Sequence, residues 1–173
     1  MRIILTIIFL FLINIASAQE YAYILNNEFE NLYSQALLYF KTDKINVYKD
    51  IRGIVLTFDL EDISSNFFEL NQLTKGKLII IENFLAKIKN PVIIEVHTGK
   101  NSKINLRNLK EWEVTTVIAN NIEDFWLSRG KILNSQIRSV GYGIFLPSKN
   151  TPNNGVKNSG RVDIIILCSI NGE

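Results

Sequence analysis

The sequence of 173 residues contains one cysteine and one histidine, and neither sign of charge is in strong excess. The cysteine, Cys168, cannot form an internal disulfide, and we interpret it as a small buried apolar residue. A net charge of +2 is too small to indicate a surface for nucleic acid or for an acidic membrane. No nucleophile–base pairing is visible, and no glycine-rich phosphate loop follows a strand. The sequence therefore predicts neither an enzyme nor a cofactor.

Candidate metal ligands are also few. His97 has no Cys or His nearby, although Glu95 shares its strand face, and we interpret His97 as structural. Asp59, Glu61 and Asp62 lack the regular spacing of a calcium loop, so they indicate a solvated loop. The sequence therefore predicts no metal site.

Residues 1–18 have the pattern of a secretory signal peptide. Arg2 supplies the positive start, residues 3–15 the apolar core, and Ala16-Ser17-Ala18 a small-x-small cleavage site. The alternative is a retained membrane anchor, but the apolar run of about thirteen residues is shorter than the roughly twenty that a span requires. No cysteine follows the small residues, which excludes the usual lipid modification. We expect a cleaved leader and no transmembrane span afterwards.

The rest of the chain alternates between helical and strand patterns. Apolar residues at spacings of three and four predict a helix within residues 19–42, which either packs on the domain or docks onto a partner. Strands are expected at 52–58, 92–98, 137–142 and 161–168, helices at 72–89 and 111–129, and loops at 59–71, 100–110 and 147–160. Right-handed crossovers place both later helices on one face of the sheet. The order β-α-β-α-β-β thus predicts an α+β two-layer sandwich over residues 51–170, with 19–50 as an N-terminal helical extension.

Five short motifs then stand in an order that resembles a known family. They are Leu56-Thr57-Phe58-Asp59 (family LxFD), Val96-His97-Thr98-Gly99 (GHTD), residues 111–122 (NWELSxxRAxxV), residues 136–143 (RLxxxGYG) and residues 155–164 (GRxxNRRVEI). Together they cover roughly residues 51–168 and resemble the C-terminal peptidoglycan-binding domain of the OmpA family, which includes the flagellar stator protein MotB. The resemblance implies an OmpA-like fold in the periplasm or envelope of a Gram-negative-type bacterium.

The family's ligand pocket is mostly replaced in this chain. In the family, the Asp of HTD and the Arg of LSxxRA hold the charged groups of a peptide-stem diamino acid; these positions are Gly99 and Ile118 here. Each hydrogen bond to a charged group contributes about 1.5–3 kcal/mol, so losing two or three weakens binding by about two to five powers of ten. We therefore expect weak or no binding of peptide stems. The family's ligand positions correspond to Thr98, Gly99, Glu111, Thr115, Ile118, Gly160 and Arg161.

Three residues of the helix predicted at 111–129 allow alternative interpretations. Ile118 either adapts the pocket to an apolar ligand or simply completes the apolar stripe of its helix, and we favour the second. Trp112, like Trp126, could mark a glycan platform, but its helical spacing favours core or rim packing.

Two functions remain open for this domain. One is a wall-binding module that tethers something to peptidoglycan through the modified pocket. The other is a scaffold or assembly subunit, in which the fold serves contacts within an envelope protein complex and no longer binds peptidoglycan. Fold alone does not establish function, and the family resemblance inclines us toward a wall-associated role.

Overall fold

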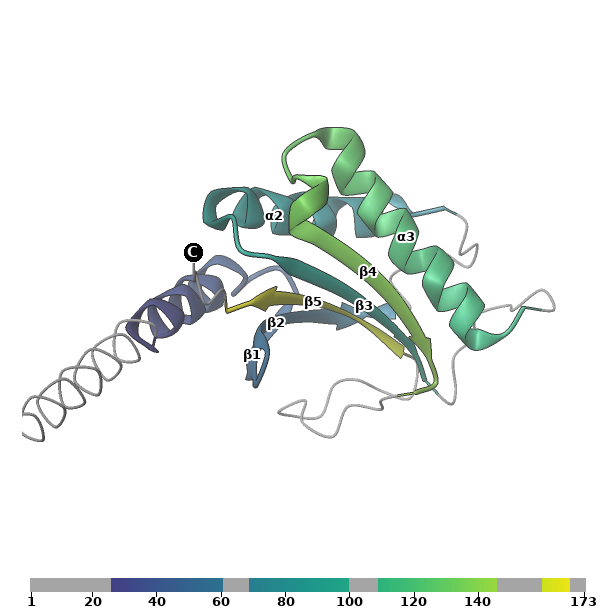
Figure 1. The fold of residues 1–173 in the computed structure, drawn as a ribbon, viewed down its shortest axis with the longest axis horizontal. Coiled ribbons are helices and arrows are strands. Elements are labelled where there is room, and N and C mark those ends of the chain that lie inside the picture. Colours follow the sequence, from purple (N-terminus) through teal and green to yellow (C-terminus); the bar gives the residue numbers. More distant parts are fainter. Residues whose placement is uncertain (1–25, 61–68, 100–108, 146–159, 169–173) are drawn as a thin grey trace, which may run out of the picture.

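The computed structural model describes residues 26–60, 69–99, 109–145 and 160–168, which form a five-stranded sheet with the long helices on one side (Figure 1). The strand order across the sheet is β1-β2-β5-β3-β4. β3 and β4 are parallel, and the other neighbouring pairs are antiparallel. The predicted α+β two-layer sandwich is confirmed. In chain order the elements are β1 (Asn46–Asp50), β2 (Gly53–Asp59), α2 (Gln72–Ile88), β3 (Val92–Thr98), α3 (Glu111–Arg129), the short 3-10 helix η2 (Asn134–Gln136), β4 (Ile137–Gly143) and β5 (Gly160–Leu167).

The two faces of the sheet carry different side chains, because successive residues of a strand point to opposite sides. On β3, Ile94 and Val96 belong to the hydrophobic core beneath α2 and α3. Glu95 and His97 alternate with them and face the side without these helices, where Asp163 of β5 lies directly opposite Glu95. The alternation thus separates an apolar core from a buried polar cluster.

Local capping interactions determine where α2 and α3 begin and where α3 ends. The backbone N–H of Lys110 donates to the Glu113 carboxylate at 2.7 Å, which satisfies a donor at the start of α3. Gly130 ends α3 in the left-handed region, with φ of 71°, as the sequence predicts. The side-chain oxygen of Asn71 accepts the Thr74 N–H at 2.7 Å and caps the start of α2. The two helices therefore begin and end close to their predicted limits.

The two tryptophans of α3 lie in different environments. Trp126 is fully buried, and its indole N–H donates to the Leu78 carbonyl of α2 at 2.9 Å. It packs in the core, as expected. Trp112, in the first turn of α3, is 48 % exposed.

The first strand, β1, is not predicted by the sequence. Residues 46–50 fall in the stretch predicted as a helical extension, but they pair antiparallel with β2, with Tyr48 opposite Val55. β1 is the edge strand, and none of its residues is buried. A strand without buried residues does not need the alternation of apolar and polar residues by which a half-buried strand is recognised, so no local pattern predicts it. The sheet begins before the boundary predicted at residue 51.

The helix over residues 26–39, purple in Figure 1, packs on the domain in its described part. Ala36 is buried in the core, and the ring of Phe40, just after the helix, lies 5.1 Å from the Phe84 ring of α2. Near the start of the helix, Glu30 pairs with Lys49 of β1 at 2.6 Å. None of the described helices combines the length and the apolar character needed to cross a membrane.

Some predictions concern residues outside the described ranges. These are the leader at 1–18, much of the three predicted loops, and Glu61 and Asp62 of the acidic loop. The prediction of a buried Cys168 is wrong: this residue is exposed, because it follows the last residue of β5 and no longer belongs to the sheet.

Candidate ligand-binding site at the carboxyl ends of β3 and β4

The structure gathers several of the predicted positions at one end of the domain. Thr98 is the last residue of β3 and lies in register with Gly160, the first residue of β5. The start of α3 reaches the same end, because the N–H of Gly143, at the end of β4, donates to the hydroxyl of Thr115 at 2.9 Å. Strand ends that meet a helix N-terminus are a common place for ligands in α/β folds.

Two glycines of β4 allow α3 to approach so closely. A side chain at Gly141 would place its Cβ 2.1 Å from the backbone nitrogen of Thr116. A Cβ at Gly143 would lie 2.8 Å from the Trp112 nitrogen, and this glycine also has φ of +58°. The Gly-Tyr-Gly motif is therefore a packing requirement of the β4–α3 contact.

Thr115 takes part in the same contact between α3 and β4. Its side chain is fully buried, and its hydroxyl donates toward the carbonyls of Glu111, at 3.0 Å, and Trp112, at 3.1 Å. It also accepts the Gly143 N–H. Its hydrogen-bonding capacity is thus used within the fold. Glu111, the first residue of α3, is partly exposed at this end.

Ile118 lies in the hydrophobic core. It is 1 % exposed and belongs to the same apolar cluster as Val114 and Ile122 of α3. An arginine here would have to bring its charge into that cluster or displace its neighbours. The side chain fills space along the helix stripe, which is the role we favoured.

The backbone around Gly160 leaves no room for a side chain. Gly160 has φ of +110°, and a Cβ would come 2.6 Å from the carbonyl oxygen of His97 and 3.1 Å from the nitrogen of Gly99. The family's arginine at this position therefore has no equivalent without a change in the backbone. The hydroxyl of Thr98 lies beside this point, buried and without a hydrogen-bond partner among the described residues.

Arg161 lies on the other face of the sheet. It stands opposite His97, and its Nε donates to Asp163 Oδ2 at 2.6 Å in a buried ion pair. Because side chains alternate along β5, Arg161 points away from the face that carries Thr98 and Thr115. Of the seven predicted positions, the structure thus separates Arg161 from the others. Only two of the seven, Gly99 and Glu111, are partly exposed, and the other five are buried.

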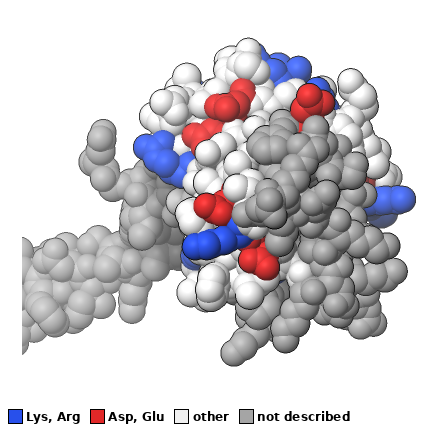
Figure 2. Space-filling model, turned by 90° about the vertical axis from the view of Figure 1, so that its right-hand side faces the viewer, with Lys and Arg blue, Asp and Glu red and all other residues white. Residues whose placement is uncertain are grey.

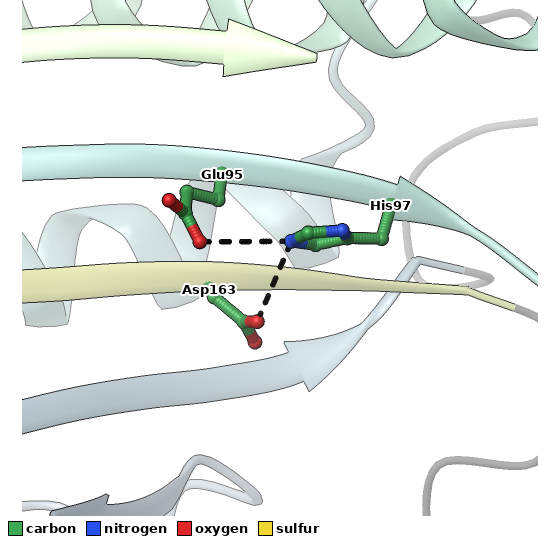
Figure 3. Close-up of side chains that lie close together, drawn as sticks. All are labelled: Glu95, His97 and Asp163. Carbon is green, nitrogen blue, oxygen red and sulfur yellow. Dashed lines mark ion pairs between the residues drawn. The ribbon is translucent and has the colours of Figure 1, made fainter. Parts of the chain in front are cut away.

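A buried polar cluster on this opposite face was not predicted (Figure 3). Glu95, His97 and Asp163 are each at most 3 % exposed. Arg52 donates to both oxygens of Glu95, at 2.6 and 3.2 Å. Glu95 shares the face of His97 by alternation alone, but Asp163 reaches them through the β3–β5 register, which no local pattern reveals.

Glu95 of this cluster and the neighbouring Tyr142 have shifted pKa values. Burial acts to raise the pKa of Glu95, but the nearby His97 ring and the hydrogen bonds and positive charge of Arg52 outweigh it, so the pKa lies below its ordinary value. Burial raises the pKa of the Tyr142 phenol, and the negative charge of Glu95 adds to this. The Tyr142 ring stacks on His97 with 5.1 Å between centroids. The surroundings therefore favour an ionised Glu95 carboxylate beside a neutral Tyr142 phenol.

Among the described residues that Figure 2 shows, acidic and basic side chains are interspersed with uncharged ones. This distribution agrees with the small net charge of +2.

Comparison with known proteins gives relatives at the level of the fold. No family model matches the sequence. The uncharacterised Bacillus subtilis protein YtxE is 27 % identical over 121 residues, which are 68 % of this chain and 50 % of that protein, so the chain spans about half the length of this relative.

Two solved structures match a larger share of this chain than YtxE does. A MotB-like protein from Desulfovibrio vulgaris superposes with a TM-score of 0.68 at 19 % identity, over 83 % of this chain and 96 % of that one. The cell wall anchor of the T6SS from Pseudomonas aeruginosa gives a TM-score of 0.61 at 15 % identity, over 78 % of this chain and 96 % of that one. The chain therefore has the fold of the OmpA- and MotB-like domains, as its motifs predict.

Proposed function

We propose that this chain is a non-catalytic, wall-associated protein of the cell envelope whose pocket for peptide stems has lost most of its affinity. The fold supports wall association, because the similar structures include a cell wall anchor and a MotB-like protein. The predicted leader at residues 1–18 supports export to the periplasm or envelope.

The observation that carries the reduced affinity is the state of the pocket. Ile118 occupies the position of the family's arginine and is buried in the core, while Gly160 adopts a backbone conformation that excludes a side chain. Gly99 supplies no carboxylate at the end of β3. These three positions therefore supply neither of the opposite charges that would hold a zwitterionic diamino acid.

Co-sedimentation of the mature chain with purified peptidoglycan sacculi tests the proposal. We expect saturable pelleting, with little or no binding of a soluble diaminopimelate-containing stem peptide. The variant Gly99→Asp restores one ligand group at an accessible strand end and should increase stem-peptide binding. Ile118→Arg is a poor companion variant, because it would bury a guanidinium in the core.

The alternative is a scaffold that binds an envelope protein complex. The N-terminal helix favours this candidate, because Leu37 and Leu38 remain exposed on it, Leu38 by 76 %. A chain that stays folded but does not pellet with sacculi would support the scaffold and contradict wall association.

A further inference from the structure

Three side chains with metal-ligating atoms converge on the sheet face opposite α2 and α3 (Figure 3). Glu95 and His97 come from β3 and Asp163 from β5. One ligand atom from each lies within 4.8 Å of the others. His97 Nε2 is 3.7 Å from Glu95 Oε2 and 3.7 Å from Asp163 Oδ2, so the imidazole edge points between the two carboxylates.

The hydrogen bond of His97 Nδ1 determines whether Nε2 of the neutral ring carries a hydrogen. His97 Nδ1 lies 3.2 Å from the carbonyl oxygen of Phe145. A carbonyl oxygen only accepts, so Nδ1 carries the hydrogen and donates it. In the neutral imidazole, Nε2 then presents a bare lone pair toward two carboxylates. Three electron-rich atoms face one another, which is unfavourable unless a positive species lies between them.

The distances distinguish a metal ion from a proton. An N–H···O hydrogen bond has a donor–acceptor distance of about 2.7–3.2 Å. The observed 3.7 Å is too long on both sides, and Nε2 has no hydrogen-bond partner among the described residues. In a tetrahedral zinc site with bonds of about 2.0–2.2 Å, neighbouring ligand atoms are roughly 3.3–3.6 Å apart. The observed spacing is close to that of ligands around a cation.

The surroundings resemble the outer partners of a metal site. Metal-bound histidines commonly donate their second ring N–H to a carbonyl, as His97 does to Phe145. Ligating carboxylates are themselves hydrogen-bonded, and here Arg52 holds Glu95 while Arg161 holds Asp163. The second oxygen of Asp163, Oδ1, is buried and has no partner within the described chain. A lone pair thus remains available on each carboxylate.

We propose that Glu95, His97 and Asp163 bind a divalent metal ion, with Zn²⁺ best suited to one imidazole and two carboxylate ligands. The ion links β3 to β5 at the end of the sheet where Phe145 follows β4. Arg52 and Arg161 already balance the two carboxylates, so the ion adds two uncompensated positive charges. We therefore expect weaker binding than at a site whose carboxylates lack arginine partners.

Zinc loading of the full chain tests this proposal. Because the ligands are buried, the chelator-treated chain is unfolded and refolded with and without Zn²⁺, then separated from free metal. We expect one zinc per chain by elemental analysis and a Tm that rises with zinc concentration. His97 is the sole histidine, so its imidazole nitrogen resonances are unambiguous, and the Nε2 signal should shift on loading.

Two variants locate the ion. His97→Asn keeps an amide donor near the Nδ1 position, within reach of Phe145, and removes the Nε2 ligand; it should bind zinc at least about tenfold more weakly. Cys168→Ser removes the exposed thiol, which is another potential zinc ligand, and should bind as the native chain does.

Three results would overturn the proposal. They are a native chain that retains no zinc, binding that survives in His97→Asn, and binding that is lost in Cys168→Ser. If His97→Asn fails to fold by circular dichroism, Asp163→Asn takes its place with the same expected loss.

Discussion

At the scale of single residues, the hydroxyl of Thr115 has a role that can be measured. It accepts the buried Gly143 N–H at 2.9 Å, so Thr115→Val leaves that N–H without a partner. We expect a loss of about 1–3 kcal/mol in the free energy of unfolding, measured by urea denaturation. Thr116→Val is the matched control, because the Thr116 hydroxyl only donates to the Trp112 carbonyl near the surface. Equal effects of the two variants would contradict this role.

The lowered pKa of Glu95 predicts how the free energy of unfolding changes at acidic pH. Its folded-state pKa is below the ordinary value of 4.5, so the ionised form is favoured more in the folded than in the unfolded chain. Its contribution is full above about pH 4.5 and is lost as the pH falls through the folded pKa. Urea denaturation with a chelator present should show Glu95→Gln less stable than the native chain at pH 7. The difference should shrink at pH 3, and a difference that grew on acidification would contradict the sign.

Local sequence patterns predict the environment of some residues, but they do not reveal contacts that depend on the pairing of distant strands. The buried place of Ile118 follows from a local helical stripe, which the sequence displays directly. Asp163 instead meets His97 through the register of two strands that are distant in the chain. For the same reason, the separation of Arg161 from Thr115 could not be read from the motifs.

At the scale of elements, the contact between α3 and β4 depends on glycine. Gly141→Ala would press a methyl group against the α3 backbone, at 2.1 Å from Thr116 N, so we expect a loss of more than about 3 kcal/mol or failure to fold. Gly76 in α2 is the matched control, because a Cβ there meets nothing within 4 Å. Gly76→Ala should stabilise by about 0.5–1 kcal/mol through helix propensity. Thermal and urea unfolding check both variants, and a well-folded Gly141→Ala of native stability would contradict the packing argument.

The buried helices and strands could be predicted from the sequence more accurately than the exposed strand. β3 and α3 have the predicted limits, because a buried apolar pattern and terminal signals such as Gly130 define them. β1 is an exposed edge strand, so its residues carry no such pattern and its place depends on pairing with β2. The predicted order of helices and strands from residue 52 onward thus holds, while the sheet gains one strand, β1, at its edge.

At the scale of the whole molecule, the chain combines the fold of MotB-like domains with different residues at the positions that the family motifs assign to the ligand. The fold is similar to that of the MotB-like protein from Desulfovibrio vulgaris, and one hydrophobic core joins α2, α3 and the sheet. What differs lies at the carboxyl ends of β3 and β4, where Gly99 and Gly160 supply no charged side chain. The function that we propose, wall association without tight recognition of the peptide stem, rests on both observations.

The most direct test is displacement from the wall. The mature chain is bound to peptidoglycan sacculi, and an excess of soluble diaminopimelate-containing stem peptide is added before pelleting. We predict that the chain pellets with the sacculi and that the stem peptide does not release it, because the pocket positions that would hold the stem lack their charged side chains. A chain that remains in the supernatant from the start would contradict wall association. Full release by the stem peptide would show that the family pocket still dominates binding.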